Sequence, residues 1–133
     1  MTTEVVVDAS AVIRVVSERT DAAAELANRL GGVAVNAPHL LDAEVGDVLR
    51  RKVLHGHLEP ETAVTGLLAL HRIVDARYPH VGALAQDAWE LRDRVRFYDA
   101  LYVALAARLD VPLLTSDVKL GKALGLPCAV EVV

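Results

Sequence analysis

The chain has 133 residues, of which 53% are hydrophobic, and it carries a net charge of −4 with a single cysteine. This length and apolar content predict one globular domain with its own core. The longest stretch without a charged residue, residues 30–41, is too short to span a membrane. A secretory signal requires positive charge before its apolar run, and none precedes the first apolar run of this chain. A single cysteine excludes an internal disulfide. We therefore expect a cytoplasmic protein with no membrane association.

Short apolar runs rich in β-branched residues alternate with segments of helical spacing along the whole chain. Strands are predicted at residues 4–7, 33–35, 111–115 and 128–133, with a weaker one near Ile73 and Val74. Helices are predicted at residues 9–16, 21–30, 39–55, 60–70, 79–95, 98–109 and 117–124. The helices at 79–95 and 98–109 could instead form one bent element. The alternation is typical of an α/β fold in which helices cover both faces of a parallel sheet.

Ligands of such sheets bind at the carboxyl ends of the strands, near the point where the strand order reverses. The glycine-rich phosphate-binding motifs of this architecture are absent. Carboxylates stand at the strand ends instead, with Asp8 after residues 5–7 and Asp117 after residues 113–116. Each could also be the N-cap of the following helix, a role that Asp favours and that is worth about 1 kcal/mol. Both interpretations stay open for these two residues.

Two further acids are predicted to point toward the interior of the fold. Glu44 falls inside the apolar arc of its helix, between Leu40 and Val48. Asp99 lies on the helix face that Tyr102 also occupies, although a first-turn acid can simply favour the helix dipole. Inward carboxylates therefore need a source of positive charge.

No lysine or arginine is expected to face inward beside Glu44 or Asp99. Buried, unpaired carboxylates cost several kcal/mol and repel one another. Divalent cations would supply the missing charge, and ligation by oxygen alone suits Mg²⁺ or Mn²⁺. Two such ions can activate water for the hydrolysis of phosphodiester bonds. The sequence thus predicts a metal site formed by Asp8, Glu44, Asp99 and Asp117.

Basic and aromatic residues cluster in the second half of the chain. Arg92, Arg94 and Arg96, like residues 50–52, are expected to form a solvated helix face. The net negative charge argues against a uniformly basic nucleic-acid-binding face, without excluding an enzyme that acts on nucleic acid. The aromatic cluster favours core packing, with an oligomer interface as the alternative; its members are Trp89, Phe97, Tyr98 and Tyr102.

Four fragments, in this order, resemble the motifs of the PIN-domain family and of its VapC-type toxins from bacterial toxin–antitoxin pairs. They are VVVDASAVI, the acid within LLDAEVGDVL, FYDALYVALA and LLTSD. Together they extend over essentially the whole chain. The resemblance implies a single PIN domain over residues 1–133, with a five-stranded parallel sheet flanked by helices on both faces.

The resemblance also implies a function and a site. It implies an endoribonuclease that depends on Mg²⁺ or Mn²⁺, forms a homodimer and hydrolyses RNA with metal-activated water. It implies an antitoxin partner whose C-terminal segment blocks the acidic site. A PIN-like RNA-processing nuclease, or a weakly active binding partner without a toxin role, is the alternative. By motif position the catalytic and metal-binding acids are Asp8, Glu44, Asp99 and Asp117, and the supporting polar residues are Ser10, Thr115 and Ser116.

Overall fold

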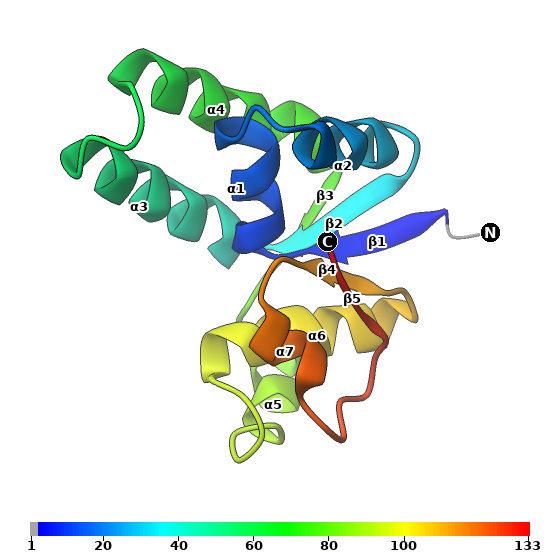
Figure 1. Cartoon of the computed structure of the whole chain (residues 1–133). Helices are drawn as coiled ribbons and strands as arrows, with labels where there is room; N and C mark the ends of the chain where they lie inside the picture. Colours follow the sequence, from blue (N-terminus) through cyan, green and yellow to red (C-terminus); the bar gives the residue numbers. More distant parts are fainter. Residues whose placement is uncertain (1–2) are drawn as a thin grey trace.

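The computed structural model describes residues 3–133, which form five strands and seven helices (Figure 1). The strands are β1 (Glu4–Val7), β2 (Ala34–Pro38), β3 (Ala76–Tyr78), β4 (Leu113–Thr115) and β5 (Val130–Val132). The helices are α1 (Ala9–Ser17), α2 (Asp21–Gly31), α3 (Leu40–Leu54), α4 (Pro60–Ile73), α5 (Ala83–Trp89), α6 (Phe97–Leu109) and α7 (Val118–Lys122). The expected α/β fold, with a five-stranded parallel sheet, is confirmed.

The five strands form one sheet in the order β3-β2-β1-β4-β5, and every neighbouring pair is parallel. The chain runs from β1 outward through β2 to β3, and then crosses to the other side of β1 for β4 and β5. The strand order therefore reverses between β1 and β4. In open parallel sheets, the carboxyl ends of two such strands flank the ligand-binding crevice.

Helices α1 to α4 cover one face of the sheet, and α5 to α7 cover the other (Figure 1). Because β1 lies at the centre and is covered on both faces, Val5, Val6 and Val7 are all 0% exposed. Helix α6 is buried at every position from 100 to 106 and packs against β1, β2 and β4. This central packing holds the carboxyl ends of β1 and β4 in fixed positions.

Most predicted helices begin and end within a few residues of their predicted bounds. Thr20 caps α2 as expected, since its hydroxyl accepts a hydrogen bond of 3.1 Å from the backbone N–H of Ala23. In the part of the chain that the structure describes, no helix is both long and apolar enough to cross a bilayer.

Two predictions about the middle of the chain are wrong. The third strand does not lie near Ile73 and Val74, because α4 continues to Ile73 and Val74 is its buried C-cap. The helix predicted at 79–95 is much shorter, since Gly82 has a φ of +68° and helical structure begins only after it. Residues 90–94 then form turns, so α5 and α6 are separate helices and do not form one bent element. As a result, Arg92 and Arg94 lie on a turn and not on a helix face.

Candidate active site

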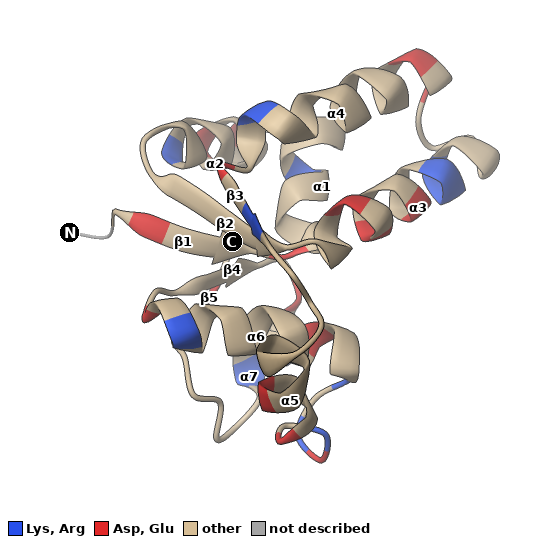
Figure 2. Ribbon diagram, turned by 180° about the vertical axis from the view of Figure 1, so that it is seen from behind, with Lys and Arg blue, Asp and Glu red and all other residues tan. Residues whose placement is uncertain are grey.

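The four predicted acids all lie toward the carboxyl edge of the sheet. Asp8 follows β1 and Asp117 follows β4, the two strands that flank the reversal of strand order. Glu44 lies in the first turns of α3, which begins where β2 ends. Asp99 lies in the first turn of α6, and because α6 leads back to the start of β4, its own start lies at the carboxyl edge. Figure 2 shows acidic residues along α3.

Two hydroxyl groups hold the carboxylate of Asp8, which is only 6% exposed. Ser10 Oγ donates to Oδ1 at 2.6 Å, and Thr115 Oγ1 donates to Oδ2. The backbone N–H of Ser116 donates to Ser10 Oγ at 2.8 Å, and that of Asp117 donates to Thr115 Oγ1 at 3.0 Å. Because each hydroxyl has one proton and already accepts a backbone N–H, its proton is directed at Asp8. The turn after β4 therefore orients both oxygens of the acid that follows β1.

Burial raises the pKa of Asp8 above its usual value, and the nearby charge of Asp99 raises it further. Hydrogen bonds from Ser10, Thr115 and the N–H of Ala11 oppose this rise without cancelling it. The bond from Ala11, at 3.1 Å, makes Asp8 the N-cap of α1. The capping interpretation is thus correct for Asp8, and burial at the same time disfavours its charge unless a cation lies nearby.

Glu44 is partly buried and accepts a hydrogen bond of 2.5 Å from the hydroxyl of Tyr102 on α6. Burial raises the pKa of Glu44, the bond from Tyr102 lowers it, and the charges of Asp99 and Asp8 raise it again. Burial also raises the pKa of Tyr102, so this phenol stays protonated and donates. The position of Glu44 agrees with the inward orientation predicted from the apolar face of its helix.

Asp99 forms an ion pair with Arg96, whose Nε lies 3.3 Å from Oδ2. The side chain of Asp99 is 20% exposed and that of Arg96 is 75% exposed. The hydrogen bond with Asp99 raises the pKa of Arg96, and the charges of Glu44 and Asp117 act in the same direction. The sequence predicted no inward-facing lysine or arginine beside Glu44 or Asp99, and Arg96 does not contradict this, because it is exposed and reaches Asp99 from the solvent side at the start of α6.

Asp117 is the N-cap of α7 and uses one oxygen for this role. Its Oδ1 accepts hydrogen bonds from the backbone N–H groups of Lys119 at 2.9 Å and Leu120 at 3.4 Å. Beside it, the hydroxyl of Ser116 is buried and has no hydrogen-bond partner within residues 3–133. The capping interpretation is correct here as well, and Oδ2 of Asp117 is left without a hydrogen bond from the described residues.

These residues fit a divalent cation in charge and in donor chemistry. The charge of Asp99 raises the pKa of Asp8, and the charges of Asp99 and Asp8 raise the pKa of Glu44. The four carboxylates offer the oxygen ligands that Mg²⁺ and Mn²⁺ prefer. The unpartnered hydroxyl of Ser116 is a further oxygen at this edge. The side-chain positions do not form a finished ligand sphere, since no three His, Cys, Asp or Glu side chains within residues 3–133 surround a common point.

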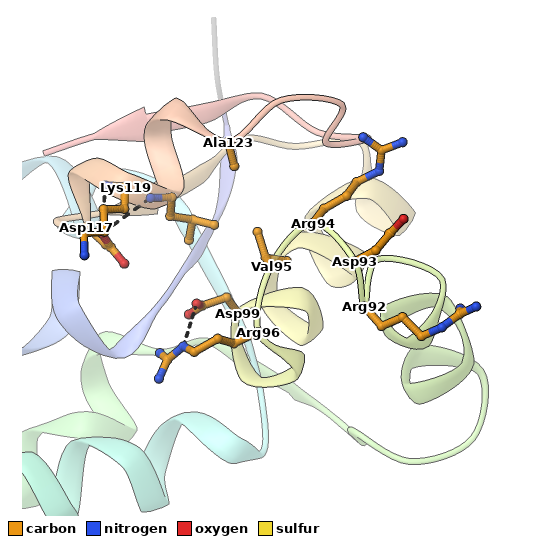
Figure 3. A pocket seen from close by; sticks show the side chains of 10 residues that line it. Arg92, Asp93, Arg94, Val95, Arg96, Asp99, Asp117, Lys119 and Ala123 are labelled. Carbon is orange, nitrogen blue, oxygen red and sulfur yellow. Dashed lines mark hydrogen bonds and ion pairs between the residues drawn. The ribbon is translucent and has the colours of Figure 1, made fainter.

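Asp99 and Asp117 line the same open cavity of about 690 Å³, together with Arg96 and Lys119 (Figure 3). The cavity lies between the turn that precedes α6 and the first turn of α7 (Figure 3). Substrate can therefore approach Asp99 and Asp117, the outer acids, from solvent, whereas Asp8 is buried in the fold.

The sequence interpretation missed Tyr102 and Arg96 as site residues. Both lie three positions from Asp99 on the chain, one on each side, and such spacing brings side chains together on a helix. Core packing, the first expectation for the aromatic cluster, is wrong for Trp89, Phe97 and Tyr98, which are exposed, and is correct for Tyr102, which is 2% exposed. Its hydroxyl still reaches Glu44, which the spacing from Asp99 could have suggested.

Residues 5–124 match the family model of the PIN domain. The chain is 51% identical over 130 residues to Ribonuclease VapC1 of Mycobacterium tuberculosis (strain ATCC 25618 / H37Rv), and the match covers 98% of each chain. The match therefore extends over essentially the whole fold.

Two solved structures share the fold at low sequence identity. The structure of VapBC2 from Rickettsia felis bound to a DNA fragment from their promoter matches with a TM-score of 0.73 at 11% identity, over 98% of each chain. Mycobacterium tuberculosis VapC20, a Sarcin-Ricin loop cleaving toxin, matches with a TM-score of 0.66 at 18% identity, over 88% of this chain and 92% of that one. The chain therefore belongs to the PIN-domain family, in its VapC branch.

Proposed function

We propose that this chain is the ribonuclease toxin of a toxin–antitoxin pair and that it hydrolyses RNA phosphodiester bonds with the help of Mg²⁺ or Mn²⁺. The near full-length similarity to Ribonuclease VapC1 supports RNA as the substrate. The observation that carries the metal-dependent chemistry is the gathering of Asp8, Glu44 and Asp99 at the carboxyl edge of the sheet, where burial and repulsion between neighbouring acids raise the pKa of Asp8 and of Glu44. Divalent cations with oxygen ligands relieve such repulsion.

We assign the metal-binding role to Asp8, Glu44, Asp99 and Asp117. A divalent ion held there would lower the pKa of a coordinated water and stabilise the charge on the leaving oxygen. Ser10 and Thr115 keep Asp8 in one orientation, and Tyr102 does the same for Glu44. Arg96 lies beside Asp99 at the cavity, where its guanidinium can donate to an oxygen of the scissile phosphate.

Cleavage of total bacterial RNA by the purified protein tests this proposal. We expect cleavage with Mg²⁺ or Mn²⁺, none in excess chelator, and none with Asp99→Asn. Asp47→Asn is the matched control, because Asp47 lies on the solvent side of α3 and pairs only with Arg50 and Arg51. Cleavage that persists in chelator would refute the metal mechanism, and equal loss in both variants would refute the assignment of the site.

We also propose a homodimer and a cognate antitoxin as partners. The VapBC assembly among the structural relatives supports the antitoxin. Exposed aromatic side chains support self-association, since Trp89 is 58%, Phe97 42% and Tyr98 54% exposed. Tyr102, which was grouped with them in the sequence, is buried and belongs to the core.

Light scattering of the purified chain, and of the chain purified with its natural partner, tests both associations. We expect a dimer at micromolar concentration and a complex with equal numbers of the two proteins. Trp89→Ala should weaken the dimer, whereas Leu54→Ala, which removes a comparably exposed apolar side chain at the end of α3, should leave it intact. A monomeric chain with no partner would contradict the proposal.

A further inference from the structure

The cavity beside the outer acids is lined by basic side chains that the proposed chemistry does not use. Arg92 and Arg94 come from the turn before α6, and Lys119 comes from α7 on the other side (Figure 3). We call Arg92, Arg94 and Lys119 the basic wall. Asp93 also lines the cavity, but the four basic residues of the lining outnumber its three acidic ones, so positive charge is in excess there even without a bound cation. Figure 2 shows basic and acidic residues alternating along this turn.

The three basic residues of the wall form no ion pair with a described residue, whereas most arginines of this chain do. Seven of the eleven arginines form an ion pair with a carboxylate. Arg92, Arg94 and Lys119 form none with any residue of the described part of the chain, and all three are exposed. Unpaired cations at one cavity are therefore available to a negatively charged ligand.

Arg94 and Arg92 are held in position by contacts that leave most of their N–H groups free. Arg94 Nη1 donates to the backbone carbonyl of Leu124 at 3.4 Å, which links the turn to the loop after α7. Gly125 lies directly against this guanidinium and has a φ of +73°, so a side chain there would displace Arg94. Arg92 lies over the ring of Trp89, with Cζ 5.2 Å from its centroid. Each guanidinium has five donors, so both can still bind a phosphate.

The charge distribution of the chain indicates a role for the cations of the basic wall. The chain has a net charge of −4 and gathers four acids at the proposed site, so it repels a polyanion at long range. RNA binding by such a protein needs local positive charge next to the reacting bond. We propose that the basic wall binds the phosphate groups of single-stranded RNA that flank the scissile bond, and this inference rests on the proposed ribonuclease function. Recognition by the wall is of the backbone and does not depend on the base sequence.

Binding of RNA without turnover tests the inference. The probe is fluorescent oligo(U) of about 12 nucleotides, a length in the range of single-strand sites, measured by anisotropy in excess chelator over a series of salt concentrations. The double variant Arg92→Gln with Arg94→Gln should weaken binding by about tenfold at low salt and reduce the salt slope by about 1.4, the value for two lost phosphate contacts. Arg94→Lys, which keeps the charge, should retain most of the affinity.

The matched control is the double variant Arg19→Gln with Arg72→Gln. These two arginines are exposed, form no ion pair with a described residue and lie on the face that α1 to α4 cover. The control should bind oligo(U) like the wild type. Equal loss of affinity in both double variants would mean that only net charge matters. The inference would also be overturned if the variant with Arg92→Gln and Arg94→Gln bound oligo(U) as tightly as the wild type, or if the wild type did not bind it.

Cleavage assays with added metal separate this inference from the proposed function. In them the wall variant should raise KM more than it lowers kcat, because it loses binding of the flanking phosphates and not the reacting groups. Binding to the wall without cleavage under any metal would refute the ribonuclease function and leave the wall as a phosphate site. Cleavage with an unchanged KM and unchanged oligo(U) binding would refute the wall, and would point to an acidic protein segment as its ligand.

Discussion

The inner acids, Asp8 and Glu44, and the outer acids, Asp99 and Asp117, are supported in different ways. Hydroxyl groups bind both inner acids, with Ser10 and Thr115 on Asp8 and Tyr102 on Glu44, although Asp8 also accepts the N–H of Ala11 as the cap of α1. The outer acids are bound by a guanidinium and by backbone N–H groups at a helix start. Hydroxyls orient a carboxylate without neutralising it, whereas Arg96 already supplies a positive charge to Asp99.

This difference indicates that the two halves of the site, the inner acids and the outer acids, have different roles. The inner acids are fixed in the fold, and burial disfavours their negative charge unless a cation lies nearby, which suits a permanent ligand for a cation. The outer acids border an open cavity, and the guanidinium that pairs with Asp99 is 75% exposed and free to move. Arg96 can therefore exchange between Asp99 and a substrate phosphate without disturbing the core.

The largest expected effect tests whether inner and outer acids form one metal site. Excess Mg²⁺ or Mn²⁺ should stabilise the wild type, by about 2.7 kcal/mol when free metal is a hundred times Kd. Glu44→Gln, an inner change, and Asp99→Asn, an outer change, should both lose most of this shift in thermal melts. Asp47→Asn should keep it. Equal shifts in all four proteins would show that the two halves share no metal.

The next effect concerns the hydroxyl that supports Asp8. Thr115 is 0% exposed, and Thr115→Val keeps its shape while leaving Asp8 Oδ2 without its donor and the N–H of Asp117 without its acceptor. We expect a loss of about 2 kcal/mol in the free energy of unfolding, measured with urea. Thr65→Val is the control, because Thr65 is exposed and bonds only to a carbonyl of its own helix. A similar small loss in both would mean that the hydroxyl network is not structural.

A smaller effect separates the two roles of Asp117. Asp117→Ala should lower stability by about 1 kcal/mol, since it removes the cap of α7. Asp117→Ser retains a capping oxygen and should recover most of that loss, but a hydroxyl does not restore the negative charge of the outer half. If Asp117→Ser also restored the metal-induced shift or RNA cleavage, capping would be the only role of this residue.

The sequence predicted where these acids lie in the fold because each stands at a position with a simple geometric meaning. Asp8 and Asp117 follow buried strands, and the reversal of strand order brings those strand ends together. Glu44 interrupts an apolar helix face, and the structure places it partly buried, at the hydroxyl of a residue from another helix. Local pattern and parallel-sheet topology are sufficient for this level of prediction.

The contacts between these acids were harder to predict because they depend on how separate segments pack. Thr115 reaches Asp8 across 107 positions of the chain, and the direction of its proton follows from a backbone N–H. Arg96 lies only three positions before Asp99, and the two pair because the turns at 90–94 end there and α6 begins directly after Arg96, its N-cap. Helical periodicity, extended through residue 95, concealed that turn and with it the basic wall.

The smallest expected effect is the pH dependence of the inner half, measured without metal. Burial raises the pKa of Glu44 above its ordinary value of 4.5, so the folded state holds this proton more tightly than the unfolded state does. Stability from this group is therefore full below that value and is lost as the pH rises through the higher folded pKa.

Glu44→Gln removes this loss, so its stability advantage over the wild type should grow with pH across that window. Tyr102→Phe should enlarge the loss in the wild-type background, because it removes the hydrogen bond that favours the charged form. Urea unfolding in chelator from about pH 4 to about pH 8 measures both differences. Parallel pH curves for the wild type, Glu44→Gln and Tyr102→Phe would mean that Glu44 is solvated like an outer acid, and the distinction between the two halves would then rest on Asp8 alone.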